Sequence, residues 1–349
     1  MKPLLPYWLQ DDNSHDVVLS TRFRLARNFP DLPFPLRATP HTDEIVKERV
    51  QTALSREFPH WRVDPADTIA QVARELLFEM HLISHHLKEN PQETLIALSP
   101  EARAILLVNE EDHLRIQLLL PGYGLAHNWR ELVTIENRLA QWLEFAFHPQ
   151  YGYLTACLSN VGTGLRASVM LHLPGLSWTG NLAPTVNMWP DPGIEFRGIF
   201  GEGSSMDTSF IQLSNKVTLG ADVGGIVRNV LNSVEHLIGL ERRAREQIFL
   251  QNPLRLEDSV YRSLGILRSA RLMASQEATA HLSLLRLGSC LGLCRNLSPS
   301  KVLRLLVGIR PAHLQVQSDE PMSIGERDER RAAHLRSQME LLVEDINDG

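Results

Sequence analysis

The pattern of apolar residues changes at Asn252-Pro253, and this change constrains the fold more than any other feature. Before it, short apolar runs come in pairs around polar turns, as in residues 104–108 and 114–120, which flank the turn NEEDH. Runs of this length predict strands, and a short turn between two of them predicts antiparallel pairing. After it, the chain shows helical periodicity and no good strand candidate. The sequence therefore predicts an α+β fold whose antiparallel sheet is flanked by helices, followed by an all-helical C-terminal domain.

This division gives domains of residues 1–253 and 254–349. Further strands are expected at residues 17–19, 152–157 and 210–215, and residues 194–205 (IEFRGIFGEGSS) are expected to begin as a strand that enters a flexible glycine loop. Helices are expected at residues 41–57, 70–90 with a break near His85, 127–147, 221–252, and in the segment after the glycine-rich turn that precedes Leu165. The strands come in meander-like pairs rather than regular βαβ units, which favours an antiparallel sheet over a parallel one.

The composition excludes several classes of protein. A formal net charge of −6 argues against nucleic acid as a partner, because phosphate neutralisation needs a surplus of Lys and Arg. The N-terminus has early prolines and acidic residues, so no signal peptide is expected, and no run of about 18 apolar residues predicts a membrane span. The sparse cysteines, Cys157, Cys290 and Cys294, favour a reducing compartment, so we expect a cytoplasmic protein. Cys290 and Cys294 could form half of a metal site, but no second ligand pair lies nearby, so we favour core packing and predict no metal site.

Two motifs gather charged side chains. In residues 20–24 (STRFR), Arg22 and Arg24 alternate on an extended segment, so both point to one face and suit a polyphosphate. Residues 109–115 (NEEDHLR) place three consecutive acids in a turn, where a cationic ligand would relieve their repulsion. A solvated strand face and an exposed acidic hairpin are the structural alternatives.

Two glycine-rich segments complete the set. Residues 157–169 (CLSNVGTGLRASV) place Gly162, Gly164 and Arg166 at the start of a predicted helix, where free N–H groups suit anionic oxygens. Their spacing matches neither a Walker loop nor a dinucleotide-binding fingerprint. Residues 197–205 (RGIFGEGSS) predict either a closing lid or an ordinary glycine-rich turn. Because no acidic cluster forms a dedicated cage, Mg²⁺ would be held mainly by phosphate oxygens and water.

In this order, STRFRLARN, NEEDHLRI, C-x-S-N-V-G-T-G-L-R-A-S-V and RGIFGEG resemble the catalytic domain of the guanidino kinases, or ATP:guanido phosphotransferases. The resemblance runs from about Asp16 to the C-terminus and is closest to the bacterial protein-arginine kinase branch. The short stretch before the first motif leaves no room for the N-terminal helical domain of kinases that act on small guanidino compounds. The helical tail contains ERDERRA, which resembles the R-D-x-x-R-A motif that binds phosphoarginine allosterically in this branch, although a charged, solvated helix face is the alternative.

The resemblance implies an ATP-dependent kinase that phosphorylates arginine side chains of proteins and marks them for regulation or degradation. Implied cofactors are ATP and Mg²⁺; implied partners are protein substrates with exposed arginines, a second copy of the chain, a zinc-finger activator and an unfoldase-protease. Glu111, with Glu110 beside it, would face the acceptor guanidinium, and Cys157 would be the active-site thiol. A guanidinium is protonated and has no free lone pair, so a carboxylate must orient it and take a proton as the nitrogen attacks the γ-phosphorus.

The resemblance also implies two sets of binding residues. Those for ATP are Ser20, Thr21, Arg22, Phe23, Arg24, His81, Arg115, Arg166, Ala167, Ser168, Val169, Met170, Arg197, Gly198, Ile199, Phe200, Gly201 and Glu202. Those for allosteric phosphoarginine are Arg327, Asp328, Arg330, Arg331 and Ala332.

Two positions depart from the family pattern. Leu158 stands where the family has a proline after the cysteine, which changes the stiffness of the loop. Ser205 stands where the family usually has a second acceptor-binding glutamate, although Asp207 could reach the same place. Two alternatives therefore stay open: a non-catalytic module that binds phosphoarginine or nucleotide, and a kinase of a small free guanidino compound.

Overall fold

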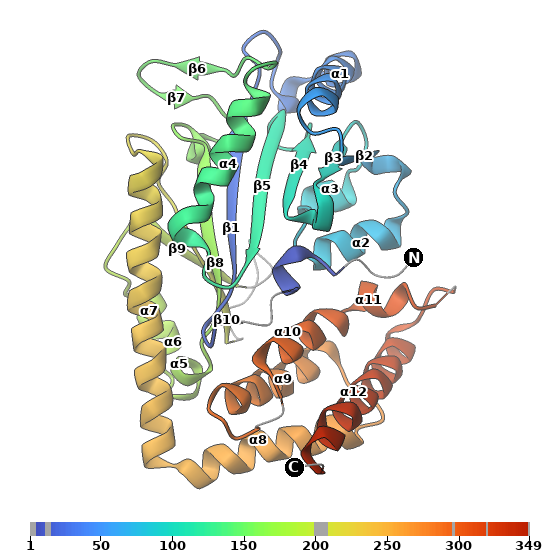
Figure 1. Ribbon diagram of the computed structural model, residues 1–349, viewed down its shortest axis with the longest axis vertical. Coiled ribbons are helices and arrows are strands. Elements are labelled where there is room, and N and C mark those ends of the chain that lie inside the picture. Colours follow the sequence, from blue (N-terminus) through green and yellow to red (C-terminus); the bar gives the residue numbers. More distant parts are fainter. Residues whose placement is uncertain (1–4, 11–14, 199–208, 295–296, 319, 348–349) are drawn as a thin grey trace.

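The computed structural model describes residues 5–10, 15–198, 209–294, 297–318 and 320–347. Its centre is an eight-stranded sheet in the order β2-β3-β4-β5-β1-β8-β10-β9, and every neighbouring pair is antiparallel (Figure 1). The strands are β1 (Val18–Arg27), β2 (Arg62–Pro65), β3 (Leu95–Leu98), β4 (Ala104–Val108), β5 (Leu114–Pro121), β8 (Leu165–His172), β9 (Ile194–Gly198) and β10 (Phe210–Asn215). A separate ribbon pairs β6 (Phe147–His148) with β7 (Gly152–Tyr153). The predicted antiparallel sheet is confirmed.

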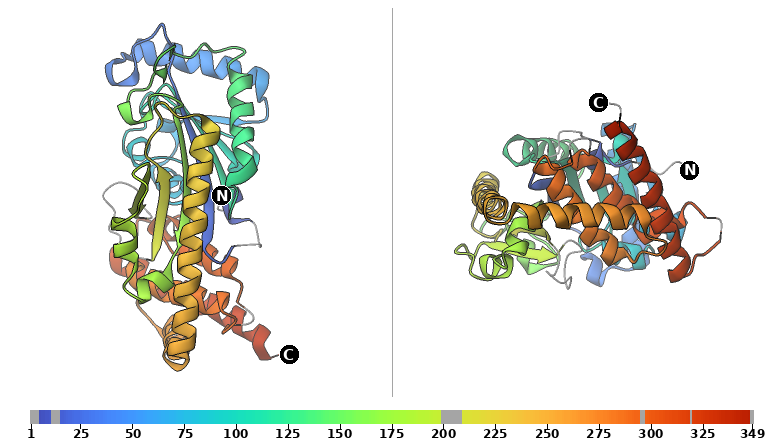
Figure 2. Two further views of the ribbon diagram at one scale, coloured as in Figure 1. Left: turned by 90° about the vertical axis from the view of Figure 1, so that its left-hand side faces the viewer. Right: turned by 90° about the horizontal axis from the view of Figure 1, so that it is seen from below.

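Helices cover one face of the sheet and form the C-terminal part of the chain. They are α1 (Pro40–Glu57), α2 (Gln71–Glu79), α3 (His85–Glu89), α4 (Leu125–Leu139), α5 (Pro174–Trp178), α6 (Leu182–Asn187), α7 (Val223–Gln251), α8 (Pro253–Ser269), α9 (Ser275–Cys290), α10 (Pro299–Gly308), α11 (Pro311–Gln315) and α12 (Ile324–Asn347). The long α7 runs beside the sheet and meets α8 at Asn252, and α8–α12 form a helical layer below the sheet (Figures 1 and 2). None of the helices in the described ranges has the length and apolarity to cross a membrane.

The two faces of the sheet are built differently. Alternate residues of the central strands, such as Phe23 and Leu25 on β1, point to one face and form a core with apolar residues of α1, α4 and α7. On the other face, Leu19, Met170 and Phe210 join the core of the C-terminal helices at one end of the strands. The same face carries polar side chains farther along, and there it borders a cavity. One sheet face therefore supports both the helical domain and the candidate site.

The segment after the glycine-rich turn was predicted to be a helix, and this prediction is wrong. Residues 165–172 form β8, which pairs with β1 on one side and β10 on the other. A short apolar run bounded by glycine fits a buried strand as well as a helix, and pairing on both sides decides for the strand. The proposed anion site at a helix N-terminus therefore does not exist here, and Arg166 stands on a strand.

Other predicted boundaries also shift. The helix expected at 127–147 ends at Leu139, and the chain then turns so that the N–H of Ala146 donates to the carbonyl of Asn28 at 2.7 Å. Of the strand expected at 152–157, only Gly152 and Tyr153 lie in β7. The strands β2, β3 and β6 were not predicted. The helix expected at 70–90 is two helices, α2 and α3, and residues 80–84 form the break.

The glycine-rich turn needs glycine for steric reasons. Gly164 has φ +64°, and a Cβ there would lie 2.7 Å from the carbonyl oxygen of Ala26 and 2.5 Å from the guanidinium of Arg27. Gly162 has φ +115°, and its Cβ would lie 2.4 Å from the carbonyl oxygen of Thr218. Both glycines therefore allow the chain to pass close to β1 and to the segment before α7.

A buried polar cluster joins the sheet to the C-terminal helices. His172 at the end of β8 is fully buried; its Nε2 pairs with the Ser283 hydroxyl at 2.8 Å, and its Nδ1 accepts from Arg286 at 2.8 Å. Burial, followed by the nearby charges of Arg286 and Arg245, holds the pKa of His172 well below its usual range. The ring is therefore neutral in the folded chain.

The neutral ring predicts a dependence of stability on pH. The unfolded histidine has a pKa near 6.5, higher than in the fold, so below about pH 6.5 the unfolded chain binds a proton that the fold does not. We expect the free energy of unfolding to fall there by about 1.4 kcal/mol per pH unit for this group. Denaturant titrations between pH 5 and 7 would measure the slope, and His172→Gln should reduce it by about one proton. An unchanged slope in the variant would contradict this account.

Candidate active site

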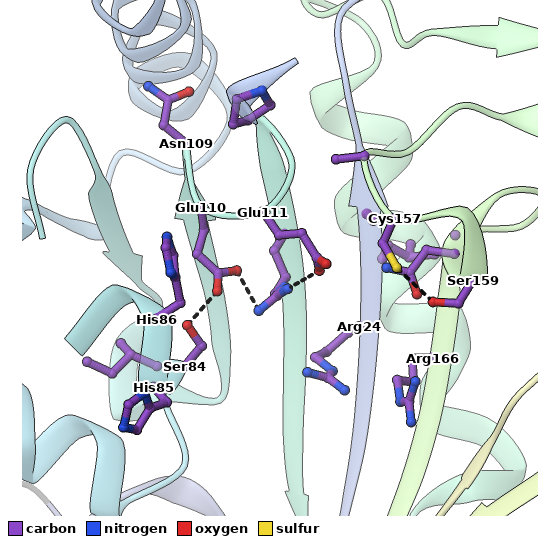
Figure 3. A pocket seen from close by; sticks show the side chains of 18 of the residues that line it. Arg24, Ser84, His85, His86, Asn109, Glu110, Glu111, Cys157, Ser159 and Arg166 are labelled. Atoms are coloured by element: carbon purple, nitrogen blue, oxygen red, sulfur yellow. Dashed lines mark hydrogen bonds and ion pairs between the residues drawn. The ribbon is translucent and has the colours of Figure 1, made fainter. Parts of the chain in front are cut away.

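A large cavity opens on the polar part of the sheet, where β5, β1, β8, β10 and β9 follow one another in the strand order. Its volume is about 1010 Å³, and Arg22, Arg24, Arg115, Arg166 and Arg197 all line it. We call these five residues the arginine cage. Glu110, Glu111 and Cys157 also line this cavity, and Arg115 forms ion pairs with both glutamates, so it joins the arginine cage to the acidic side chains (Figure 3).

The cage follows from strand register. Arg22 and Arg24 alternate on β1, and Arg24 lies directly opposite Arg166 on β8. The predicted common face of Arg22 and Arg24 is thus confirmed. Arg22 donates to the side-chain oxygen of Gln212 on β10 at 3.1 Å, whereas Nε of Arg24 has no hydrogen-bond partner in the described part of the chain. Burial and the neighbouring arginines lower the pKa of Arg22 to about 10 and hold that of Arg24 well below its usual range. Such a crowd of like charges is costly in the absence of an anion.

Glu195 on β9 provides one counter-charge inside the cage. Its Oε1 forms ion pairs with Arg166 and Arg197, and all three side chains are mostly buried. Sequence reasoning missed Glu195. One of its partners, Arg166, lies far from it along the chain, and the other, Arg197, lies two residues farther along the same strand. The Glu195 carboxylate is therefore ion-paired with two guanidinium groups that an anionic ligand would bind.

The acidic turn between β4 and β5 divides its carboxylates by exposure. Glu110 is buried; its Oε1 accepts from the Ser84 hydroxyl at 2.5 Å, and its Oε2 pairs with Arg115 at 2.5 Å (Figure 3). The side chain of Glu111 is 41% exposed and pairs with Arg115 at 2.9 Å. Glu110 is therefore held in place, while Glu111 offers its carboxylate to the cavity.

Asp112, the third acid of the turn, has a structural task. It is buried, and its Oδ1 accepts from the side chain of Asn28 at 2.6 Å and from the N–H of Ala156 at 2.7 Å. Burial raises the pKa of this carboxyl. Because Ala156 precedes Cys157, the contact ties the acidic turn to the cysteine loop. The Sγ atom of Cys157 lies 3.0 Å from the Ser159 hydroxyl (Figure 3).

His81 enters the site from the break between α2 and α3. Its backbone has φ +61°, and its carbonyl accepts from the side chain of Gln117 at 3.2 Å. The ring lines the large cavity and a small adjoining one that Ser20, Ser168 and Met170 also line. Burial and the charges of Arg310 and Arg22 keep its pKa well below the usual range, so the ring adds no positive charge to the cage.

The remaining residues expected to bind ATP lie elsewhere. The side chains of Phe23, Ala167 and Val169 belong to the core on the opposite face, and Thr21 is buried with its hydroxyl donating to the carbonyl of Gly122 at 2.8 Å. Gly198 ends β9. Ile199, Phe200, Gly201 and Glu202, together with Ser205 and Asp207, lie outside the described residues.

The residues of the R-D-x-x-R-A motif all lie on α12. Arg330 is exposed, Arg327 and Asp328 are half-buried, and Ala332 belongs to the core. Arg331 is fully buried; it donates to the carbonyls of Ile309 at 2.9 Å and Met273 at 2.8 Å and pairs with Asp328 at 2.5 Å. In this conformation, Arg331 joins α12 to the segments around it.

The two cysteines of the C-terminal part lie apart from the cavity. Cys290 ends α9 and approaches the carbonyl of Asp16 at 3.7 Å, while Cys294 packs against the core of the C-terminal helices. Within the described ranges, no group of three or more His, Cys, Asp or Glu residues could hold a metal ion.

Comparison with known proteins covers nearly the whole chain. Residues 43–244 match the C-terminal catalytic domain of the ATP:guanido phosphotransferases, and residues 253–348 match the C-terminal domain of the protein-arginine kinase McsB. Among solved structures, lombricine kinase matches with a TM-score of 0.57 at 23% identity, over 68% of this chain and 71% of that one. The duplicated taurocyamine kinase of Schistosoma mansoni, with bound transition-state analogue components, matches with a TM-score of 0.60 at 25% identity, over 73% of this chain and 39% of that one.

Curated relatives match at higher identity. The protein-arginine kinase of Brevibacillus brevis is 39% identical over 96% of this chain and 95% of its own length. That of an Exiguobacterium species is 40% identical over 96% of both chains, and that of Halalkalibacterium halodurans is 39% identical over 96% and 95%. Relatives of this identity and coverage show that the chain belongs to the protein-arginine kinase branch of the ATP:guanido phosphotransferase family.

Proposed function

We propose that this chain transfers the γ-phosphoryl group of ATP to the guanidinium of arginine side chains in proteins. The observation that carries the proposal is that one cavity is lined by five arginines, a pair of glutamates and a cysteine. A triphosphate needs the first set of groups and a guanidinium needs the second. The names of the relatives point to the same reaction, with protein as the acceptor.

The arginine cage would bind and orient the triphosphate. Arg24 and Arg166 lie next to each other on adjacent strands, and Arg22 and Arg115 approach from either side of them. Their donors are set by the sheet before ATP arrives, so little reorganisation accompanies the reaction. Charge on the transferring group is shared among them, and positioning supplies much of the rest of the rate enhancement.

The acidic turn would bind the acceptor. Glu111 lies at the cavity surface and can orient the incoming guanidinium, whose nitrogen attacks the γ-phosphorus while the bond to the leaving ADP oxygen breaks. The proton released from that nitrogen passes to the Glu111 carboxylate. Glu110 holds Arg115 in place, and Cys157 lies on the other side of the acceptor position.

Magnesium would arrive with the nucleotide. Its preferred ligands are oxygens, and the residues around the cavity supply more donors than oxygen ligands, which suits an ion held by phosphates and water. The ion would neutralise phosphate charge that the cage leaves uncompensated.

Several finer assignments also belong to this proposal. The ATP site includes the residues expected from the family pattern, among them those at 199–202, and the domain boundary lies near Pro253, where the second family match begins. The tail motif on α12 binds phosphoarginine and regulates the kinase. The protein acts in the cytoplasm as a homodimer, with a zinc-finger activator, and marks substrates for an unfoldase-protease.

Glu195 should weaken ATP binding, because its carboxylate competes with phosphate for Arg166 and Arg197. We expect Glu195→Gln to lower the KM for ATP about fivefold, since one such ion pair contributes about 1 kcal/mol. Steady-state kinetics at varied ATP would measure this, with Glu131→Gln as a control that breaks a pair with Arg103. A higher KM in Glu195→Gln would show instead that the carboxylate orients the two arginines for phosphate.

The proposed function is tested by incubating the full chain with Mg·ATP and an arginine-rich protein such as casein. Mass spectrometry at neutral pH should detect acid-labile phosphoarginine, and free arginine offered in parallel should be a poor acceptor. Efficient phosphorylation of free arginine would favour a kinase of small guanidino compounds. Binding of ATP without any transfer would favour the non-catalytic module, the alternative raised by Ser205 at the position of the usual glutamate. The names of the relatives do not support that alternative.

A further inference from the structure

Glu79 and the five residues that separate α2 from α3 connect the C-terminal helices to the acidic turn. Glu79, the last residue of α2, is buried and faces α11. Its Oε1 accepts from the N–H of Ala312 at 2.9 Å, and its Oε2 accepts from the N–H of His313 at 3.1 Å. The same Oε2 lies 2.8 Å from Nδ1 of His313. One carboxylate thus uses both oxygens to hold the first turn of a helix in the other domain.

The other end of the connector reaches the candidate catalytic carboxylates. Ser84 begins α3, where its hydroxyl accepts from the N–H of Leu87 at 3.1 Å. The same hydroxyl donates to Glu110 at 2.5 Å, and Glu110 in turn pairs with Arg115 (Figure 3). The position of Ser84 therefore helps to set the positions of Glu110 and Arg115.

The residues between these ends leave little freedom. Met80, Leu82 and Ile83 are buried in the core shared with the C-terminal helices. The carbonyl of Met80 accepts from the indole of Trp8 at 3.0 Å, and that of His81 accepts from Gln117. A segment held in this way transmits a displacement at one end to the other, because packed interiors do not deform continuously.

We propose that Glu79 is a positioning residue for phosphoryl transfer, which acts by docking α11 and thereby holding Ser84 against Glu110. The inference rests on the proposed function, since it assigns a role in that reaction. It also explains why a buried carboxylate at the end of α2 points away from the cavity while its connector supplies two side chains, those of His81 and Ser84, to it.

The docked helix is linked to the tail as well. The carbonyl of Ile309, directly before the Arg310 that precedes α11, accepts from Arg331 of α12. Arg331 therefore holds the backbone just before α11, and Glu79 holds the first turn of α11 itself. A change that withdraws Arg331 from this carbonyl is expected to loosen α11 and to reach Glu110 by way of Glu79.

The test is a double-mutant cycle of Glu79→Gln and Ser84→Ala in the full chain, with kcat and the KM for ATP measured for each. Glu79→Gln keeps the shape but loses the charge and one acceptor. We expect each single variant to lower kcat about tenfold, as small misplacements of reacting groups do, and the double variant to be no worse than either. Glu75→Gln, one turn earlier on α2 with Gln71 as its partner, should leave kcat unchanged.

Three outcomes would overturn the proposal. They are a kcat for Glu79→Gln within twofold of wild type, additive losses in the double variant, or a rise in the KM for ATP with unchanged kcat, which would assign the effect to His81. Hydrogen exchange at residues 82–87 provides a readout that does not depend on catalysis. It should accelerate in Glu79→Gln and not in Glu75→Gln, and equal exchange in both would refute the connection even if the wild-type chain transferred no phosphate.

Discussion

Replacing Glu111 with glutamine should lower kcat for phosphorylation of an arginine-rich protein by about 10²–10⁴-fold, the usual contribution of a general base. Glutamine keeps the size of the side chain and can still contact a guanidinium, but it cannot take up the proton. Within the described part of the chain, the exposed Glu111 carboxylate pairs with Arg115 through Oε2. This leaves Oε1 to the acceptor. Steady-state rates at saturating ATP and protein would measure the loss.

The control for Glu111 is Glu93→Gln. Glu93 lines the same cavity, but its side chain pairs with Lys47 on α1 at 2.7 Å, whereas that of Glu111 pairs with Arg115. It undergoes the same change of charge and should keep kcat within about twofold. If the two variants lost activity equally, the effect would come from the total charge of the cavity, and Glu111 would not be the base.

Replacing Arg24 with methionine should have opposite effects on catalysis and stability. We expect kcat to fall by about 10²–10³-fold, because one preorganised donor to the transferring group is lost. The free energy of unfolding should rise by on the order of 1 kcal/mol, because a half-buried charge among like charges is replaced by an apolar chain of similar volume. The lowered pKa of Arg24 has the same cause. Kinetics and denaturant unfolding of the same preparation would measure both.

Arg27→Met is the matched control on the same strand. Arg27 is buried, whereas Arg24 is half-buried, and Arg27 pairs with Glu136 of α4 at 2.5 Å and donates to the carbonyl of Thr163 at 3.0 Å. Removing it leaves a buried carboxylate without its partner, so stability should fall by about 3–5 kcal/mol. A stability loss in Arg24→Met as well would mean that the cage is not strained by its own charge.

Strands with clear alternation or clear polar boundaries were predictable from the sequence. The run at residues 210–215 was predicted with the same bounds as β10, and β4 likewise. The run at 165–172 was not, because its apolar residues fit two periodicities and only the pairing with β1 and β10 selects one. Local sequence cannot contain that information, since β1 lies more than a hundred residues earlier in the chain and β10 follows only after α5, α6 and β9.

The same limit applies to the site. The arginines, the acidic turn and Cys157 were recognisable because each lies in a dense local motif. Glu195, Ser84 and Glu79 each stand alone among ordinary neighbours, and their meaning comes from contacts with residues remote in the chain. Asp112 was grouped with its neighbours as one acidic cluster, whereas burial gives it a different task. Supporting residues are therefore what the structure adds.

The apolar end of the polar sheet face has a consequence for dissecting the molecule. Leu19, Met170 and Phe210 lie on the catalytic strands but are covered by α8–α12. A fragment that stops at Gln251 would expose these side chains to water beside the arginine cage. The result would be an aggregation-prone hydrophobic patch next to a charged one. The two family matches assign the strands and the C-terminal helices to separate domains, whereas one hydrophobic core contains residues of both. Exchange of the C-terminal helices between relatives would succeed only if the strand residues that pack in the same core were exchanged too. The helices and these strand residues are therefore expected to change together in evolution.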